Sequence, residues 1–511
     1  MPESAIVHAV RESAAHVPDK AAIVAAERTF TFAELERQAE AAAEFIGAQA
    51  RGDIIGLLLP NTPSFAWALL GGLWAGKTVA ALPAPAPPPL LAAMVEEAGL
   101  KTVLTNAELA PRLAQAGVAA IPVDGIPAAP GRPAPMQARP QRAAVLLYTS
   151  GTTGRPKAVE LSDENILTNV AGACQQMQFG DERQLAVLPL FHSYGLTATL
   201  LLQIARCSTM VLHERFVPRA VLQAIEQHRI TALMAIASQY RLLIKEPTQA
   251  NLSSLRVCVA GAERLPEQVA MDFEARFGVP ILQGYGVTEA SPVIAINPPQ
   301  ACRMTSVGPA LPNIRVTIRE NGAILPPGQT GEVCVEGPNV MLGYYNRPEA
   351  TAQKIVNGVL GTGDLGWLDA DGYIYLAGRS DDMVKIAGET VYPAEVEAAL
   401  ERAAGVEEAA VLAVRDEKRG IELQAFVLPK PGASVTEAAL RASCREHLPV
   451  YKVPRSFLIL EQFPRGVSGK LDKRALAAGW PEAMKKPASE PSAAADKGAV
   501  AEPGHRMNPA G

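Results

Sequence analysis

The sequence has no cysteine cluster and no excess of basic residues. Its six cysteines are scattered without a C-x-x-C pair, which is typical of reduced thiols in a core and argues against a disulfide framework or a cysteine-based zinc site. The formal net charge is −5, so nucleic acid is a poor first candidate for a partner.

Long hydrophobic runs are also missing. A membrane-spanning helix needs about 20 apolar residues, and residues 64–76 form too short a run. Residues 185–205 are interrupted by Pro189 and several polar residues, which favours a buried strand, loop and helix. The N-terminus carries acidic residues early, unlike a signal peptide. We expect a cytoplasmic protein without a transmembrane segment, and transient contact with a membrane surface stays open.

What is present is an alternation of short apolar runs with helix-like segments. The chain has 511 residues, which is more than one core usually holds. The run "DIIGLLLPN" is typical of a buried parallel strand ended by proline. Several similar runs follow, with helical segments between them, which indicates α/β architecture with parallel-rich sheets.

The residue pattern changes in the second half of the chain. From about residue 307 the sequence alternates and is rich in Gly and Pro turns, which predicts a small β-barrel-like subdomain. Residues 481–511 lack large apolar residues and are expected to be disordered. We predict an N-terminal domain at 1–379, with two α/β subdomains and the β-barrel-like one, and a small α+β C-terminal domain at 380–480.

Residues 148–158, "YTSGTTGRPKA", suit a polyanion. Glycines let backbone N–H groups approach phosphate, hydroxyls donate hydrogen bonds, and a lysine adds a mobile charge. The segment is not a Walker A loop, because Lys157 stands three residues after Gly154 and Ala158 follows it. A plain polar turn is the alternative. The candidate anion-binding residues are Thr149, Ser150, Gly151, Thr152, Thr153, Gly154 and Lys157.

Four more blocks follow in order. They read "QGYGVTEASP" at 283–292, "GTGDLGWLDADGYIYLAGR" at 361–379, "SDDMVKIAGETVYPAEVEAAL" at 380–400 and "PRGVSGKLDKRAL" at 464–476. Together with the first block, they resemble the adenylate-forming superfamily of acyl-CoA synthetases, amino-acid adenylation domains and luciferases, over the chain to about residue 480. The resemblance implies an α/β fold with a small mobile C-terminal lid. It also implies a two-step reaction, in which ATP and a carboxylate form an acyl adenylate and a thiol then displaces AMP.

The resemblance assigns a nucleotide site. The 149–157 loop would wrap the β- and γ-phosphates, Thr288 would bond the α-phosphate and Glu289 would bind Mg²⁺, which prefers carboxylate and phosphate oxygens. Asp364 would accept the ribose hydroxyls, joined by Arg379. On local grounds alone, Thr288 and Glu289 could start a helix and Asp364 could cap a turn. The segments expected to frame adenine are Gly261, Ala262, Glu263, Gly284, Tyr285 and Gly286.

The resemblance also assigns roles in the lid. Lys470 in "VSGKLD" would bridge the attacking carboxylate and the α-phosphate, although a lone lysine there could be a solvated surface charge. Asp381 matches the hinge at which the lid rotates between the half-reactions. The segment "KIAGETV", with Lys385 and Gly388, matches the loop that lines the coenzyme A tunnel, and a hairpin turn is the local alternative.

The acyl pocket is expected around "PLFHSYGL". Amino-acid adenylation domains place an aspartate after the matching aromatic to pair the substrate ammonium, whereas this chain has His192. An amino acid would therefore bury an unpaired cation, which is costly. His192 could also be a core histidine. Ala237 and Ser238 replace the Pro-Thr pair of many relatives, which leaves pocket depth open. The candidate pocket residues are Phe191, His192, Gly195, Ala237 and Ser238.

These features favour activation of a medium- or long-chain fatty acid to acyl-AMP, followed by thioester formation with coenzyme A. The cofactors would be ATP, Mg²⁺ and coenzyme A. Three alternatives stay open: a fatty-acyl-AMP ligase that loads a phosphopantetheinyl carrier protein, an aryl-acid CoA ligase, and a non-catalytic acyl-binding relative. The last would be expected to have lost Lys470, Glu289 or the 149–157 loop, and all are present.

Overall fold

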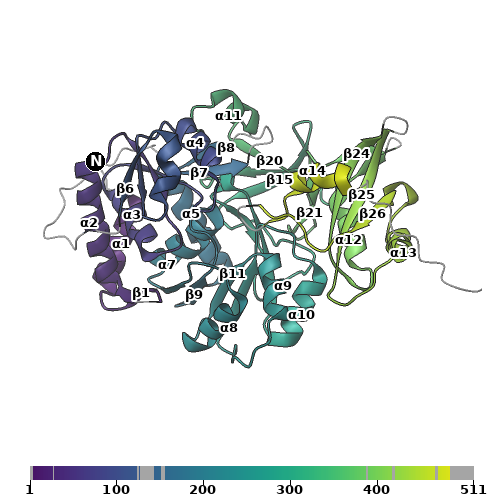
Figure 1. Ribbon diagram of the computed structural model, residues 1–511, viewed down its shortest axis with the longest axis horizontal. Helices are drawn as coiled ribbons and strands as arrows, with labels where there is room; N and C mark the ends of the chain where they lie inside the picture. Colours follow the sequence, from purple (N-terminus) through teal and green to yellow (C-terminus); the bar gives the residue numbers. More distant parts are fainter. Residues whose placement is uncertain are drawn as a thin grey trace, which may run out of the picture.

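The computed structural model describes residues 4–26, 28–123, 126, 143–150, 156–386, 389–416, 420–466 and 470–483. A large α/β N-terminal body lies beside a smaller α+β C-terminal body (Figure 1), which confirms the predicted fold class. The exact domain boundaries stay predictions. The last helix, α14 (Lys473–Ala483), runs beyond residue 480, and residues 484–511 of the expected tail lie outside the described residues.

The first sheet has seven strands in the order β18-β8-β7-β4-β3-β5-β6. Strands β3 to β7 pair in parallel, and β8 and β18 are added antiparallel at one edge. The apolar run that predicted a buried strand is β3. The strands are β3 (Ile54–Leu58), β4 (Thr78–Ala81), β5 (Thr102–Thr105), β6 (Ala119–Pro122), β7 (Val145–Ser150), β8 (Pro156–Leu161) and β18 (Gly343–Tyr344).

The second sheet has eight strands in the order β14-β13-β12-β11-β9-β10-β1-β2. Its inner strands are parallel, and the edge strands β14 and β2 are antiparallel to their neighbours. The strands are β1 (Ala21–Val24), β2 (Thr29–Thr31), β9 (Arg183–Ala186), β10 (Thr209–Leu212), β11 (Ala232–Ala235), β12 (Val257–Ala260), β13 (Ile281–Gly286) and β14 (Val293–Ile296).

Helices cover both sheets. They are α1 (Ala5–His16), α2 (Phe32–Gln49), α3 (Pro63–Trp74), α4 (Pro88–Glu97), η1 (Ala110–Ala116), α5 (Asp163–Met177), α6 (Ser193–Gly195), the π-helix η2 (Leu196–Leu201), α7 (Leu202–Ala205), α8 (Pro218–Gln227), α9 (Ala237–Lys245), α10 (Glu267–Phe277) and η3 (Thr288–Ala290). Helix α2 begins with a capping box, since Thr31 Oγ1 accepts from Glu34 N at 3.2 Å and the Glu34 carboxylate accepts from Thr31 N at 2.9 Å. This cap directs Phe32 and Leu35 into the core, where both are buried.

The third sheet is antiparallel throughout, as expected from its turn-rich sequence. Its strands are β15 (Arg315–Glu320), β16 (Ala323–Ile324), β17 (Gly331–Glu336), β19 (Ile355–Val356), β20 (Val359–Leu368) and β21 (Ile374–Arg379). Helix α11 (Pro348–Lys354) leads into β19. The long strand β20 pairs with β17, β19 and β21, so it is the centre of this sheet.

The C-terminal body has its own core around Val396, Val411 and Leu440. A hairpin of β22 (Val384–Ile386) and β23 (Glu389–Val391) precedes a three-stranded sheet. That sheet consists of β24 (Val406–Asp416), β25 (Gly420–Pro429) and β26 (Ser456–Ile459), with α12 (Pro393–Glu401), α13 (Glu437–His447), η4 (Val450–Lys452) and α14 around it. None of the helices in the described part of the chain is long and apolar enough to cross a membrane.

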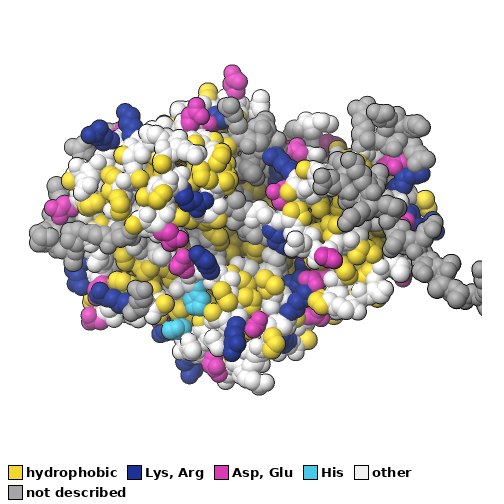
Figure 2. All heavy atoms as spheres, in the orientation of Figure 1, with side chains coloured by type: hydrophobic (Ala, Val, Ile, Leu, Met, Phe, Trp, Pro, Cys, Tyr) yellow, Lys and Arg dark blue, Asp and Glu magenta, His cyan; other side chains and the backbone are white. Residues whose placement is uncertain are grey.

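Among the described residues, three ion pairs join the two bodies. Arg241 pairs with Glu408 at 2.9 Å and Lys245 with Glu407 at 2.5 Å, while Arg264 pairs with Glu401. We call these the interdomain ion pairs. All three cations belong to the N-terminal body, on α9 or just before α10, and all three acids belong to the C-terminal body. Elsewhere on the face shown in Figure 2, charges of both signs are interspersed.

Candidate active site

Asp364 and Arg379 form one end of the candidate site. They stand opposite each other in the register of β20 and β21, which brings Arg379 Nη1 to 3.0 Å from Asp364 Oδ1. The Tyr285 hydroxyl, from β13, donates to Asp364 Oδ2 at 2.7 Å. Burial raises the pKa of Asp364, and the charge of Arg379 opposes this shift. The carboxylate is thus held in one orientation by two donors from different sheets.

Glu289 and Lys157 meet at a tyrosine that sequence reasoning missed. Tyr344 lies on β18, and its hydroxyl donates to Glu289 Oε1 at 2.7 Å. Lys157 Nζ lies 5.1 Å from the centre of the Tyr344 ring, within the range of a cation–π contact. Burial is the main cause that raises the pKa of the Tyr344 phenol, so it stays protonated and keeps donating.

The predicted anion loop has only its two ends in the described chain. Strands β7 and β8 pair as a hairpin, with Thr149 opposite Lys157 and Ser150 opposite Pro156. The hairpin therefore fixes where the loop leaves and re-enters the sheet. The rest of the predicted loop lies outside the described residues: Gly151, Thr152, Thr153 and Gly154.

Thr288 contacts a second residue that sequence reasoning missed. The Oγ atoms of Thr288 and Ser193 lie 3.1 Å apart. Ser193 directly follows His192 and begins the short helix α6. The two hydroxyls join the segment expected at the α-phosphate to the segment expected at the acyl pocket. The position of Ser193 beside His192 was the signal that could have found it.

Lys470 belongs to the C-terminal body and interacts electrostatically with two residues of the N-terminal body. Burial and the charge of Lys470 lower the pKa of His192 to about 4, so the imidazole is neutral at pH 7. Burial lowers the pKa of Lys470, while Glu263 raises it. Glu263 in turn accepts from the Ser238 backbone N–H at 3.1 Å. The structure thus brings together Lys470, His192, Glu263 and Ser238, which the sequence separates widely.

Glycine and aromatic residues shape the region around His192. The Phe191 and His192 rings lie 4.8 Å apart. A Cβ on Gly195 would lie 2.1 Å from Pro189 O, so tight backbone packing explains this glycine. A Cβ on Gly261 would lie 3.1 Å from the Tyr194 ring, whose hydroxyl donates to Val259 O at 3.2 Å. Tyr194, which sequence reasoning also missed, is therefore fixed against Gly261.

The predicted lid residues stay apart from this cluster. Asp381 and Lys385 are exposed, and Lys385 lies on the β22–β23 hairpin, where it forms no hydrogen bond or ion pair through its side chain with a described residue. Gly388 lies outside the described residues. Among the described lid residues, Lys470 is the one that interacts electrostatically with His192 and Glu263.

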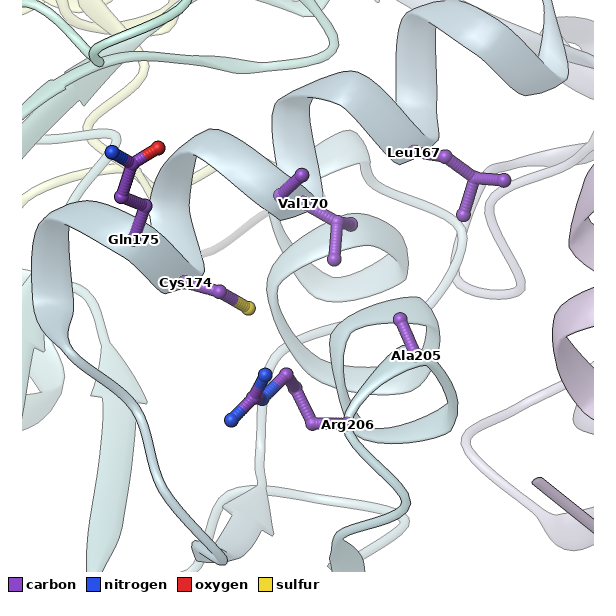
Figure 3. A pocket seen from close by; sticks show the side chains of 7 residues that line it. Leu167, Val170, Cys174, Gln175, Ala205 and Arg206 are labelled. Atoms are coloured by element: carbon purple, nitrogen blue, oxygen red, sulfur yellow. The ribbon is translucent and has the colours of Figure 1, made fainter. Parts of the chain in front are cut away.

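A separate pocket of about 440 Å³ opens between α5 and α7 (Figure 3). Its lining includes Val170, Cys174 and Arg206, and none of the candidate site residues belongs to it. Arg206 donates to Phe179 O at 2.8 Å, and burial raises the pKa of Cys174 to about 11. The thiol is protonated at pH 7, so this pocket has no activated nucleophile.

Two glycines of β13 give a matched test of the site's backbone. A Cβ on Gly286 would lie 2.1 Å from Pro292 O, whereas the nearest atom to a Cβ on Gly284 is 3.5 Å away. We expect Gly286→Ala to destabilise the protein by about 1–3 kcal/mol, the usual cost of overpacking, and Gly284→Ala to change stability by less than about 1 kcal/mol. Denaturant unfolding of both variants measures this. Equal stabilities would contradict the close approach of β13 to the Pro292 carbonyl.

His192 predicts a pH dependence of stability. Its folded pKa of about 4 lies below the unfolded value, so the unfolded chain binds more protons between pH 4 and 6.5. The stabilisation present above pH 6.5 should therefore be lost as the pH falls towards 4, by up to about 3 kcal/mol at 1.36 kcal/mol per pKa unit. Unfolding curves of the wild type and His192→Gln between pH 4.5 and 7.5 measure this. Parallel pH profiles would show that His192 is not held neutral.

Two α/β sheets, an antiparallel sheet and a small C-terminal body give the two-domain architecture of adenylate-forming enzymes. The family model for AMP-binding enzymes matches residues 10–345, and the model for the AMP-binding enzyme C-terminal domain matches residues 395–470. The chain belongs to the AMP-binding enzyme family, within the acyl-CoA synthetase and adenylate-forming superfamily.

Several relatives are CoA ligases. Feruloyl-CoA synthase of Amycolatopsis sp is 34% identical over 87% of this chain and 92% of its own length. Long-chain-fatty-acid–CoA ligase of Bacillus subtilis is 37% identical over 65% of this chain and 61% of its own length.

The fold also matches solved structures. O-succinylbenzoate CoA synthetase from Bacillus subtilis, in complex with its acyl-adenylate intermediate, has a TM-score of 0.84 at 30% identity, over 92% of this chain and 97% of that one. The same protein in complex with ATP and magnesium ion has a TM-score of 0.83 at 29% identity, over 92% and 99% of the two chains.

Proposed function

We propose that this protein is an AMP-forming acid–CoA ligase that activates an apolar carboxylic acid with ATP and transfers it to coenzyme A. The observation that carries the proposal is the position of Lys470 in the C-terminal body, near enough to the N-terminal body for its charge to lower the pKa of His192 and for Glu263 to raise its own pKa. A cation at this position would reduce the repulsion between the carboxylate of the acid and the α-phosphate of ATP. Relatives whose names describe CoA ligases support the same activity.

The residues present fit ATP and Mg²⁺. Asp364 is fixed by Tyr285 and Arg379 and is available to the ribose hydroxyls at its remaining lone pairs. Glu289 uses Oε1 for Tyr344, and its Oε2 has no partner among the described residues. One free carboxylate oxygen suits Mg²⁺, which takes most of its other ligands from phosphates and water. Bound there, the metal would neutralise charge on the phosphates.

In the first step, a carboxylate oxygen of the acid forms a bond to the α-phosphorus, and the bond to pyrophosphate breaks. Both reactants are anions, so they repel at close range. Lys470 would place its ammonium between them, and Lys157 would hold the departing phosphates. In the second step, the thiol of coenzyme A bonds to the acyl carbon and AMP leaves. Neutral His192 adds no second positive charge beside the acid.

For the acid itself, we propose an aromatic carboxylic acid. Tyr194 is fixed against Gly261 by its hydrogen bond to Val259 O. The rings of Phe191 and His192, on the same segment, lie against each other. Rigid aromatic side chains suit a flat ring, because offset stacking adds to the burial of apolar surface. The name of the Amycolatopsis relative agrees with this choice.

A medium- or long-chain fatty acid is the second candidate. Ala237 and Ser238 are small residues at the expected pocket, which leaves room for an extended chain. The Bacillus subtilis long-chain relative is similar over 65% of this chain. A phosphopantetheinyl carrier protein is the alternative acceptor to coenzyme A for either acid.

An acid panel distinguishes these candidates. We expect kcat/KM for cinnamate to exceed that for straight-chain acids of equal carbon number by about tenfold, which is about 1.4 kcal/mol of transition-state binding. For a fatty-acid enzyme, each added CH₂ would instead contribute about 0.8 kcal/mol until the pocket ends. The matched control is 3-phenylpropanoate against phenylalanine, which differ by one ammonium. Preferential turnover of phenylalanine would contradict the proposal that the substrate is an apolar acid. Separate thioester assays with coenzyme A and with a carrier protein identify the acceptor.

A further inference from the structure

A second cation lies beside the Asp364–Arg379 pair. Lys354 is the last residue of α11, and its Nζ would lie 3.2 Å from a Cβ placed on Gly363. Arg379 Nη2 would lie 3.2 Å from the same point. The two cations therefore lie on the same side of Gly363, which precedes Asp364 in strand β20. Lys354 belongs to none of the five sequence blocks that carry the family resemblance.

The ammonium of Lys354 forms no hydrogen bond or ion pair with any described residue. Its positive charge lowers the pKa of the nearby Asp364, and Glu332 also lies near Gly363. Arg379 directs Nη1 to Asp364, and Glu332 Oε1 accepts from the Gly363 N–H at 2.9 Å. Both oxygens of Asp364 and one oxygen of Glu332 thus have other donors, and two neighbouring cations would be stabilised by an added anion.

The backbone keeps the space between these cations open. Gly363 has φ of +79°, a conformation that side-chain-bearing residues rarely adopt. Any side chain there would also meet both cationic groups. The absence of a side chain at Gly363 therefore leaves room for the oxygen atoms of a ligand beside the backbone of β20.

We propose that Lys354, together with Arg379, binds a phosphate group of a substrate or product. The proposal rests on the proposed function, because it places the phosphate beside the Asp364 that would hold the ribose. Two molecules of the reaction could supply this phosphate. One is ATP or its pyrophosphate product, and the other is the 3′-phosphate of coenzyme A.

Three variants test the proposal in the full-length protein. Lys354→Ala removes the ammonium, Lys354→Met keeps the length of the side chain, and Lys354→Arg keeps the charge. Lys101→Ala, at an exposed lysine just before β5, is the matched control. Thermal unfolding of each variant verifies that the fold is retained.

If the phosphate belongs to ATP or pyrophosphate, Lys354→Ala and Lys354→Met should raise the KM for pyrophosphate in the exchange reaction about tenfold, with kcat changed less. Titration calorimetry with pyrophosphate should show the same loss. If the phosphate belongs to coenzyme A, the wild type should prefer coenzyme A over dephospho-coenzyme A, and the variants should lose that preference. In either case Lys354→Arg, which keeps the positive charge, should stay close to the wild type in the KM for pyrophosphate or in the preference for coenzyme A.

Unchanged KM values, unchanged pyrophosphate binding and an unchanged preference for coenzyme A in the folded variants would overturn the proposal. Equal losses in Lys354→Ala and Lys354→Arg would overturn it as well, because they would indicate a packing role. Failure of the proposed function is a different result, since the wild type itself would then catalyse no ATP–pyrophosphate exchange with any acid.

Discussion

Lys470→Ala is expected to reduce acid-dependent ATP–pyrophosphate exchange by at least about 10²-fold, the scale for removing one aimed electrostatic group. The charge of the lysine lowers the pKa of His192 in the other body, so its loss removes positive charge where the carboxylate would meet the α-phosphate. Thioester formation from a supplied acyl adenylate should be largely retained, because the two anions are already joined in that substrate.

Lys473→Ala is the matched control for this variant. Lys473 lies three residues further along the chain and pairs with Glu397 inside the C-terminal body at 2.9 Å. Its loss removes a charge of the same sign from the same body, at a side chain whose main electrostatic partner is Glu397 and not Glu263. Equal losses of both half-reactions in a folded Lys470→Ala protein would be incompatible with a role confined to adenylation.

Glu289→Ala and Lys157→Ala are each expected to lower the adenylation rate by about 10²-fold or more. Glu289 supplies the free oxygen proposed for Mg²⁺, and Lys157 lies at the start of β8, the strand that follows the anion loop. For Glu289→Ala, the concentration of Mg²⁺ that gives half-maximal exchange should also rise. For Lys157→Ala, the metal dependence should stay close to that of the wild type.

The variant Tyr344→Phe tests the orientation of the Glu289 carboxylate without changing any charge in the candidate site. This variant keeps the Glu289 carboxylate and the ring beside Lys157, and it removes only the hydroxyl that donates to Glu289 at 2.7 Å. We expect a loss of about tenfold, in line with about 0.5–1.5 kcal/mol for one hydrogen bond. Wild-type exchange in both Glu289→Ala and Lys157→Ala would remove the basis of the phosphate and metal assignments.

Local sequence signals predicted local structure well. The capping box at Thr31 and Glu34 depends on two residues only three positions apart, so its spacing is visible in the sequence itself. The apolar run at β3 is a buried strand, because such a run has no polar face to expose. The family resemblance assigned Asp364 and Arg379 to one site, and they pair because β20 and β21 are neighbours in one antiparallel sheet; their role at the ribose stays a prediction.

The residues that sequence reasoning missed depend on distant contacts. Tyr344 reaches Glu289 only because the two-residue strand β18 attaches to the edge of the first sheet. Tyr194 and Lys354 act beside glycines, at 261 and 363, whose missing side chains leave room for them. No periodicity or motif reports such contacts, since they depend on how separate elements pack together. The same holds for the arrangement in which Lys470 faces Glu263.

The interdomain ion pairs also bear on building hybrid enzymes. Every cation is on one body and every acid on the other, so a C-terminal body grafted from another protein would need acids at the positions of Glu401, Glu407 and Glu408. A graft with lysines there would place like charges against Arg241 and Lys245. Reversing both sets together would restore complementarity. The interdomain ion pairs could therefore be used to design two sets of N-terminal and C-terminal bodies in which each body pairs only with the partner of complementary charge.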